Sequence, residues 1–563
     1  MILLNIYIII TLISICGWGS FIKKKIFFED NQHQSISFYF FYGLFLISII
    51  SILINFFLPL KIFSNYVIIL GIILFFVILK KNFQIIQIIK FIIPTTFICF
   101  MLIYKSSNVV DFGMYHLPYI STLINEKISF GIANLHFRYA HTSIIQNISA
   151  IYFYNQIEYD SFAIIPGLIY SVTTYLIFQK IIFFKNNDKL FLLIFSGLIL
   201  SFILLRFYRY NDFGNDVPAH LLAFLSCIIF FEVVLSKKNL NNFILLIIIA
   251  SLAFFSKISL LTLFILPLSI VLFKKIRLVE IINFKFLSIF FIFFSIFFIK
   301  NIIISGCAIY PAKITCIESV AWYPKNYKDH ANVEKRSFEL KYRSRGYSDY
   351  SKNEIDKKLS KSEYIQNFNW VNTWFKNNFL NKTLKNILIF CFFVSIFFLF
   401  NFKYFFKRDD YKDVNSKYKN FFWGYLTIGI LFWFFTVPNY RYGVFYIFMP
   451  LIFYLSLLFN QRKKFIINFV KFSIFFSFIF ISFFNFKRIL SNKFYYEDFL
   501  ISKNIFYNTN IEYKKISLNN NNIVIPKNNN VCWYTIHHCT HFESAIKKLD
   551  IETKNGFKFY IPK

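Results

Sequence analysis

Long apolar runs separated by short polar or basic segments dominate the chain. A helix needs about 20 apolar residues, or about 17 at the short end, to cross the hydrocarbon core of a bilayer. Scanned on that scale, the chain contains runs at residues 2–20, 38–57, 63–80, 90–104, 161–183, 189–205, 218–235, 241–255, 258–273, 284–304, 386–402, 420–437, 441–459 and 464–484. The pattern predicts an all-α polytopic membrane protein with about fourteen transmembrane helices.

Composition supports the membrane assignment. Hydrophobic residues make up 57% of the 563 residues and charged residues only 16%, with 83 Phe and 36 Tyr. A soluble fold cannot bury this much apolar surface, and the low charge content excludes a disordered chain.

The net charge of +33 reflects basic tracts between the apolar runs, such as Lys23 to Lys25 and Arg462 to Lys464. Retention of positive loops in the cytoplasm explains these tracts. AT-rich codons for Phe, Ile, Lys, Asn and Tyr explain them as well, so no nucleic-acid partner is expected. If loop 21–37 is cytoplasmic, every short basic tract falls on the inner side. Both termini and the polar segments 105–160, 305–385 and 486–563 are then external.

Four of the eight cysteines form two close pairs in predicted external segments: Cys307 with Cys316, and Cys532 with Cys539. Short-spaced pairs in an oxidising compartment favour disulfides. A zinc site is the alternative for the second pair, because three histidines stand beside it: His537, His538 and His541.

The predicted external loop 105–160 holds the most informative polar residues. Asp111 follows the fourth apolar run, and His116 stands in the same motif, DFGMYH. An acid at the boundary between water and lipid is partly desolvated, which raises its pKa and makes it a usable base. The alternatives are a solvated loop acid and an acid paired with Arg138.

A second polar group lies at 206–216, in the segment RFYRYNDFGND on the same predicted face. Its arginines and acids, which include Arg209, Asp212 and Asp216, could bind a divalent metal or a phosphate, or could neutralise one another. Lys257 interrupts an apolar run, and Arg441 opens the thirteenth run. Such cations either extend to lipid headgroups without further function or hold an anionic lipid phosphate.

Phosphate-binding and protease motifs of the GxxxxGK, GxGxxG and HExxH types do not occur in the sequence. The predicted cytoplasmic loops are too short to fold a nucleotide-hydrolysing domain. The energy for any reaction must therefore arrive in the substrate.

This arrangement resembles the GT-C glycosyltransferases, polytopic enzymes that take sugars from polyprenyl-phosphate carriers. The resemblance makes 90–104 the first core helix, Asp111 the essential acid of the first external loop, and Asp212 or Asp216 the acid of the second loop. Six further helices follow the first core helix before the large external loop 305–385. The segment PNYRYGVFYIFMP at 438–450 is similar to a helix start common in the family.

Three motifs also resemble an uncharacterised bacterial family of large multi-pass membrane proteins for which transferase activity is expected. They are DFGMYHLPYI with GIANLHFRYAHTSIIQNISAIY, SGCAIYPAKITCIESVAWYP, and CWYTIHHCTH. The resemblance implies the bacterial cytoplasmic (inner) membrane and the following division: accessory helices 1–88, GT-C-like core 89–304, external loop 305–385, C-terminal helices 386–485 and a small external domain 486–563.

The implied activity is inverting transfer of a sugar from a polyprenyl-phosphate carrier to a glycan or lipid acceptor of the cell envelope. Asp111 would be the base, and His116 would orient it or touch the acceptor. The departing phosphate would be held by cations chosen from Arg138, Arg209, Lys257 and Arg441. Family members often carry a paired acid in the first loop, whereas Phe112 and Gly113 follow Asp111 here, so a divalent metal ion stays an open alternative.

Other function classes compete with this one. A polysaccharide polymerase or ligase would use the same class of lipid-linked substrate. A transporter of lipid-linked glycans would need ionisable residues near the bilayer midplane, and the predicted spans contain almost none. A non-catalytic scaffold would tolerate loss of any single external acid.

Overall fold

The structure is a computed structural model, and fifteen gaps separate the residues that it describes. These are 1–26, 35–79, 83–105, 111–157, 160–207, 214–236, 240–273, 284–347, 359–402, 415–459, 463–491, 495–497, 502–504, 512–519, 521–527 and 531–563. Several basic tracts that set the predicted orientation, such as Lys80-Lys81 and Lys237-Lys238, lie outside these residues.

Each predicted apolar run falls on helical structure among the described residues, although two runs are divided: 63–80 between α3 and the π-helical turn η1 (Phe75–Leu79), and 258–273 between the 3-10 helix η5 (Ile258–Phe264) and α12. The long helices are α1 (Ile2–Ile26), α2 (Ile36–Phe57), α3 (Leu60–Leu74), α5 (Ile85–Ile103), α8 (Asp160–Asn186), α9 (Leu190–Arg206), α10 (Asp216–Leu235), α11 (Leu240–Ser256), α12 (Ile265–Phe273), α14 (Phe284–Ser305), α19 (Lys385–Asn401), α20 (Ser416–Thr436), α21 (Tyr440–Leu458) and α22 (Lys463–Ser491). Short helices include α6 (Leu117–Asn125), α7 (Ile144–Ile151), α15 (Val333–Ser344), α17 (Lys361–Ile365), α18 (Val371–Trp374) and α23 (Glu543–Ile546).

Ten helices among the described residues are long and apolar enough to cross a membrane, and three apolar helices are shorter. The shorter ones are Leu190–Arg206, Leu240–Ser256 and Ile258–Phe273. The chain is therefore a mostly helical, multi-pass membrane protein, as the sequence predicts. The count of fourteen spans stays a prediction.

The tail contains β structure that the sequence analysis did not anticipate. Three small sheets are formed by β1 (Tyr495–Glu497) with β2 (Ser502–Asn504), by β3 (Tyr513–Leu518), β4 (Asn521–Pro526) and β5 (His538–Cys539), and by β6 (Leu549–Lys554) with β7 (Phe557–Pro562). All neighbouring pairs are antiparallel except β4 and β5. The β segments are shorter and more polar than the runs that form the apolar helices earlier in the chain. Alternation of apolar and polar residues along them is typical of paired strands.

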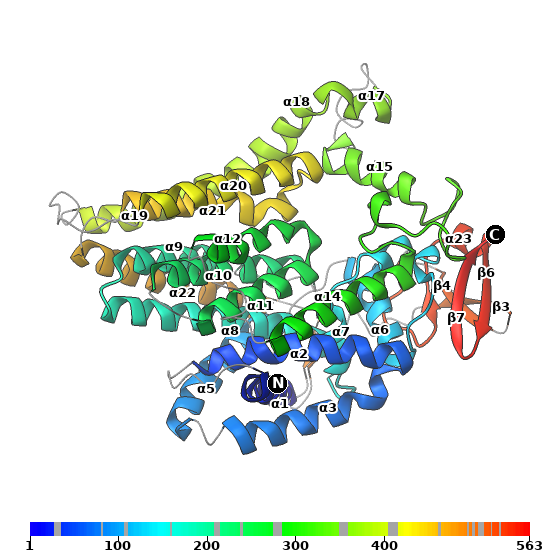
Figure 1. Cartoon of the computed structure of the whole chain (residues 1–563), viewed down its shortest axis with the longest axis horizontal. Helices are drawn as coiled ribbons and strands as arrows, with labels where there is room; N and C mark the ends of the chain where they lie inside the picture. Colours follow the sequence, from blue (N-terminus) through cyan, green and yellow to red (C-terminus); the bar gives the residue numbers. More distant parts are fainter. Residues whose placement is uncertain are drawn as a thin grey trace.

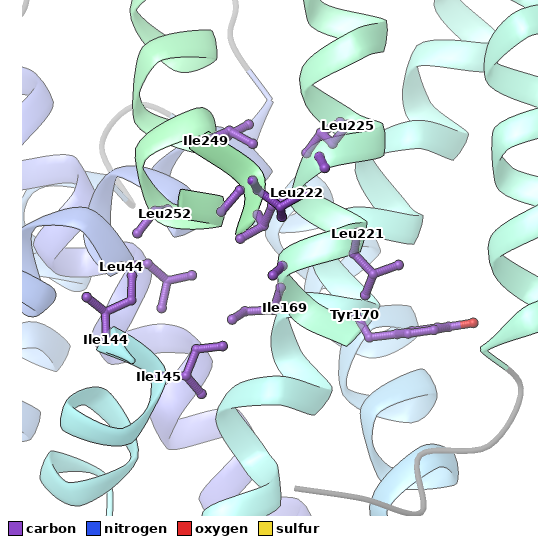
Figure 2. Packing of buried hydrophobic residues seen from close by; sticks show 14 of the residues in the cluster. Leu44, Ile144, Ile145, Ile169, Tyr170, Leu221, Leu222, Leu225, Ile249 and Leu252 are labelled. Carbon is purple, nitrogen blue, oxygen red and sulfur yellow. The ribbon is translucent and has the colours of Figure 1, made fainter. Parts of the chain in front are cut away.

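Central helices are enclosed by the others. In the most apolar part of α10, 94% of the residues are buried, whereas in that of the helical segment Val371–Phe400 only 22% are buried, which leaves a broad apolar surface for lipid. Figure 2 shows part of the enclosed core, which is contributed by α2, α7, α8, α10 and α11. Its labelled members are Leu44, Ile144, Ile145, Ile169, Tyr170, Leu221, Leu222, Leu225, Ile249 and Leu252.

Glycines allow the three N-terminal helices to approach one another closely. A Cβ on Gly17 of α1 would stand 1.8 Å from the carbonyl oxygen of Gly71 in α3. A Cβ on Gly19 would stand 1.7 Å from the carbonyl oxygen of Tyr39 in α2. Small residues at such crossings let membrane helices pack backbone to backbone.

A buried ion pair joins α8 to α10. Lys180 Nζ donates to Glu232 Oε2, and the two side chains are 8% and 7% exposed. The sequence analysis overlooked this pair, because Lys180 and Glu232 are single charges near the ends of otherwise apolar runs. A charged side chain can stay buried here only because the opposite charge of its partner compensates for the lost hydration.

The tail packs against the segment that follows Asp111. The Tyr560 N–H donates to the Phe130 carbonyl oxygen at 2.8 Å, and Phe130 forms a parallel bridge with Phe559 of β7. In Figure 1 these strands lie at the right of the molecule, near α6. The C-terminal segment is therefore positioned on residues 111–157 rather than apart from the helices.

Candidate functional site

Five charged side chains from distant parts of the sequence meet at one end of the helix bundle. These residues, called the charge cluster below, are Asp111, Arg138, Asp216, Lys257 and Arg441. Asp111 and Arg441 are 32% and 41% exposed, whereas Asp216 is 10% exposed. The cluster therefore has a buried base and a rim that solutes can reach.

Helix ends place three members of the cluster. Asp216 is the first residue of α10, where the helix dipole stabilises a carboxylate. Lys257 is extended between α11 and the 3-10 helix η5 (Ile258–Phe264), so the apolar helix is interrupted at this residue. Arg441 lies in the first turn of α21, and its backbone N–H donates to the side-chain oxygen of the N-cap residue Asn439 at 3.0 Å.

Tight turns place the other two members. Asp111 precedes the π-helical turn η2 (Phe112–His116), which leads directly into α6. Arg138 lies in the 3-10 turn η4 (Phe137–Ala140), and its backbone N–H donates to His136 Nδ1 at 3.2 Å. Both turns belong to the loop that the sequence analysis singled out.

Arg441 joins the two carboxylates. Its Nη1 donates to Asp111 Oδ2 at 3.4 Å, and its Nε donates to Asp216 Oδ2. Arg138 Nη1 donates to the other oxygen of Asp111 at 2.9 Å, and Lys257 Nζ lies 2.5 Å from the other oxygen of Asp216. Among the residues that the structure describes, three cations thus face two carboxylates. The excess positive charge at a partly exposed site favours binding of an anion.

Aromatic rings hold two of the cations in place. Lys257 Nζ lies 3.9 Å from the ring centroid of Tyr442, and Arg138 Cζ lies 4.8 Å from that of Tyr115. Cation–π contacts at these distances restrain a cation without neutralising it. The cations therefore keep their charge for a ligand.

Histidine side chains border the cluster without adding charge. His116 is buried, and the Gln146 Nε2 amide donates to its Nδ1 at 3.1 Å. Burial, reinforced by the facing Arg441 guanidinium, lowers the pKa of His116 to about 3. Its ring is therefore neutral at neutral pH. His220 donates from Nε2 to the carbonyl oxygen of Arg441 at 3.0 Å and so fixes the start of α21.

The structure brings together five of the residues proposed from the sequence. Asp111 is paired with Arg138, which was one of the alternatives left open for this acid. Among the described residues, Asp216 pairs with Lys257 and Arg441, and Arg206 donates from Nε to the Tyr440 hydroxyl at 3.0 Å. Arg209 and Asp212 lie outside the described residues.

Four neighbours of the cluster were missed by the sequence analysis: Tyr115, Gln146, His220 and Tyr442. Three of them lie in motifs quoted above, which were the available signal: Tyr115 in DFGMYH, Gln146 in GIANLHFRYAHTSIIQNISAIY and Tyr442 in PNYRYGVFYIFMP. His220 reaches the cluster only through the fold.

A divalent metal ion does not fit the described part of the site. Both carboxylates are already paired with cations. The ranges that the structure describes contain no group of three or more His, Cys, Asp or Glu side chains that could hold a metal ion.

Three more histidines pack together near the cluster: His136, His330 and His541. The ring centroid of His136 lies 6.2 Å from that of His330 and 5.1 Å from that of His541, and Phe542 packs on the latter two rings. The three do not form a group that could hold a metal ion among the described residues. Burial lowers the pKa of His330 to about 3 and that of His541 to about 4. The trio is therefore a neutral contact between three segments.

Both predicted disulfides are present. The sulfur atoms of Cys307 and Cys316 are 2.05 Å apart, and those of Cys532 and Cys539 are 2.02 Å apart. The zinc alternative for the second pair is wrong for the described residues. Cys532 and Cys539 bond each other, and His538 Nε2 lies 2.9 Å from Glu126 Oε2.

Alkylation of intact cells tests both the disulfides and the predicted sidedness. With a membrane-impermeant maleimide, we expect no labelling at the two pairs before reduction and labelling of Cys316, the partly exposed partner in the first pair, after reduction. Cys307, Cys532 and Cys539 are buried and should be labelled only when the reduced protein is also denatured. Variants that replace one pair by serine assign each signal. The buried thiols of Cys16, Cys99 and Cys227 are the internal control and stay unlabelled in folded protein. Labelling of Cys316 without reduction would contradict the disulfide, and failure to label Cys316 after reduction would contradict the assigned external face.

The charge cluster lies within residues 1–448, which match the model of a family described as "Domain of unknown function (DUF8201)". The chain belongs to this family. No curated protein and no solved structure matches the chain. The DUF8201 match includes the Cys307–Cys316 disulfide and ends within α21, before α22 and the tail.

Proposed function

We propose that the protein is a membrane glycosyltransferase that moves a sugar from a polyprenyl-phosphate carrier to a cell-envelope acceptor on the external face. The observation that carries the proposal is the charge cluster, where three cations and two carboxylates meet at helix ends. A lipid-linked phosphate must be recognised at the boundary between lipid and water, where membrane helices end, because its chain stays in the bilayer and its headgroup reaches water.

Two of the cations suit the carrier phosphate. Arg441 is 41% exposed and Lys257 is 25% exposed, so both are accessible from the rim. In the proposed reaction the bond between the sugar and the phosphate breaks, and the cations stabilise the negative charge of the departing polyprenyl phosphate. The cleaved bond supplies the driving force, which agrees with the lack of nucleotide-binding motifs.

Asp111 suits the role of base. Its carboxylate lies on the exposed rim between Arg138 and Arg441. It would accept the proton of the acceptor hydroxyl while the oxygen attacks the sugar carbon. Asp216, buried beneath it, would hold Lys257 and Arg441 in position. The chain of about fourteen spans and its GT-C-like core 89–304, with 90–104 as the first core helix, are part of the same proposal.

The position of the charges favours a transferase over a transporter of lipid-linked glycans. The cluster lies at helix ends, whereas a transporter places its binding groups near the bilayer midplane. The buried pair of Lys180 and Glu232 is compensated within the protein and so leaves no charge for a substrate.

The test is the lipid that the protein retains during purification in mild detergent. Mass spectrometry of the extract should detect a polyprenyl-phosphate sugar in the wild type. Arg441→Gln and Lys257→Gln should each retain about tenfold less, the loss expected for one charge-assisted hydrogen bond. Arg343→Gln is the matched control, because Arg343 is 62% exposed and pairs only with Glu339 among the described ion pairs. Equal retention by all variants, or no such lipid in the wild type, would contradict the proposal.

A further inference from the structure

The tail motif CWYTIHHCTH has no role in the proposed reaction, yet it lies against the turn that carries Asp111. The motif forms a loop closed by the Cys532–Cys539 disulfide. The N–H of Trp533, inside this loop, donates to the carbonyl oxygen of Gly113 at 2.7 Å. Gly113 belongs to η2, which begins directly after Asp111. The tail therefore contacts the backbone two residues after Asp111, the proposed base.

The contact between Trp533 and Gly113 is closely packed. A Cβ on Gly113 would stand 2.5 Å from the indole ring of Trp533 and 2.6 Å from Val531. Trp533 is 4% exposed, and its backbone has a φ of 50°. A bulky residue seldom adopts this left-handed conformation, so the surroundings must enforce it. Glycine at 113 and tryptophan at 533 therefore form one fitted pair.

The rest of the disulfide loop is bonded to the same segment. The Ser121 hydroxyl donates to the Thr535 carbonyl oxygen at 2.5 Å, and the Tyr139 hydroxyl donates to the Cys539 carbonyl oxygen at 2.6 Å. His538 and Lys558 hold Glu126, at 2.9 and 2.6 Å. Although burial alone would raise it, these two neighbours lower the pKa of Glu126 to about 2. The loop therefore stays attached along α6 and η4 at neutral pH.

We propose that Trp533 is a positioning residue that holds η2 so that Asp111 faces Arg138 and Arg441. The proposal rests on the proposed function for the role of Asp111. The indole packs on the backbone of Gly113 where no side chain intervenes, and the disulfide-closed loop anchors the indole. A shift of the turn moves the carboxylate relative to both guanidiniums, because Asp111 immediately precedes it. We call this contact of Trp533 with Gly113 the clamp. Trp533 lies in the tail, outside residues 1–448 that match the DUF8201 family, whereas Gly113 lies inside them.

Hydrogen exchange of the full-length protein tests the clamp without any assumption about the reaction. In Trp533→Ala, amides of residues 112–117 should exchange about tenfold faster than in the wild type, while those of α7 should not change. Trp533→Phe keeps a ring on Gly113 and should restore slow exchange. Val524→Ala is the control, because Val524 is buried beside Cys532 and Cys539 within the tail. Unchanged exchange in Trp533→Ala, or equal acceleration in Val524→Ala, would overturn the clamp.

Kinetics test the positioning role itself. With a polyprenyl-phosphate hexose as donor, Trp533→Ala should lower kcat by about tenfold to a hundredfold and leave the KM for the donor unchanged, because misplacement of about 1 Å has effects of this size. Trp533→Phe should recover most of kcat. A loss confined to KM would overturn the positioning role. If the wild type transfers no sugar, the proposed function fails, and the exchange experiment alone decides the clamp.

Discussion

Asp111→Asn should abolish sugar transfer from a polyprenyl-phosphate donor while expression and membrane insertion stay intact. Asparagine has the shape of aspartate but cannot accept the proton of the acceptor hydroxyl, and loss of a general base lowers the rate by about 10²–10⁴-fold. The variant also leaves Arg138 without its carboxylate partner at 2.9 Å. Because the Asp111 side chain is 32% exposed, water can solvate the unpaired guanidinium, and the fold should persist.

Transfer of labelled sugar in membranes or proteoliposomes measures this effect. Asp550→Asn is the matched control, since Asp550 is 56% exposed on β6 and its described partner is Lys563. The control should transfer sugar at the wild-type rate. Asp111→Glu is a second comparison, because it keeps the base but displaces it, and should retain partial activity. Full activity of Asp111→Asn would remove Asp111 from the proposed mechanism.

Glu232→Ala should destabilise the protein more than any exposed charge substitution. It leaves the Lys180 ammonium buried between α8 and α10 without its carboxylate. Removing one partner of a buried pair lowers the free energy of unfolding by about 3–5 kcal/mol. The double variant Lys180→Met with Glu232→Leu should recover most of this loss, because well-packed apolar residues replace a buried pair at little cost.

Denaturation of the purified protein by sodium dodecyl sulfate, followed by tryptophan fluorescence, measures the change. Asp188→Ala is the control, because Asp188 pairs with Lys463 where both side chains are about half exposed. An exposed pair contributes about 0–1 kcal/mol. If Glu232→Ala and Asp188→Ala destabilise the protein equally, the pair between α8 and α10 is not buried as described.

The helices could be read from the sequence because hydropathy is a local property. A run such as 218–235 is predominantly apolar, and a backbone in lipid must satisfy its hydrogen bonds within its own segment, which leaves a helix as the solution. The tail was less predictable, because β3 and β4 are short and partly polar. Their pairing depends on partners, such as β5, that lie further along the chain.

Candidate site residues could be recognised one by one but not paired. Asp216 shares a short segment with Arg206 and Arg209, and the sequence left open whether these charges neutralise one another or bind a metal or a phosphate. Among the described residues its partners are Lys257 and Arg441, which come from the ends of other helices. The order in which helices pack decides these neighbours, and hydropathy carries no information about that order.

The sequence by itself determined that the chain crosses a membrane repeatedly and that two cysteine pairs lie in polar segments. It also marked Asp111, Lys257 and Arg441 as exceptions to an apolar pattern. Only the tertiary structure decided that Arg441 contacts both carboxylates, that Lys180 is neutralised by Glu232, and that Trp533 rests on Gly113. Burial of apolar surface is nearly independent of direction. Ion pairs and fitted contacts require particular atoms from distant segments to meet, and that meeting exists only after packing.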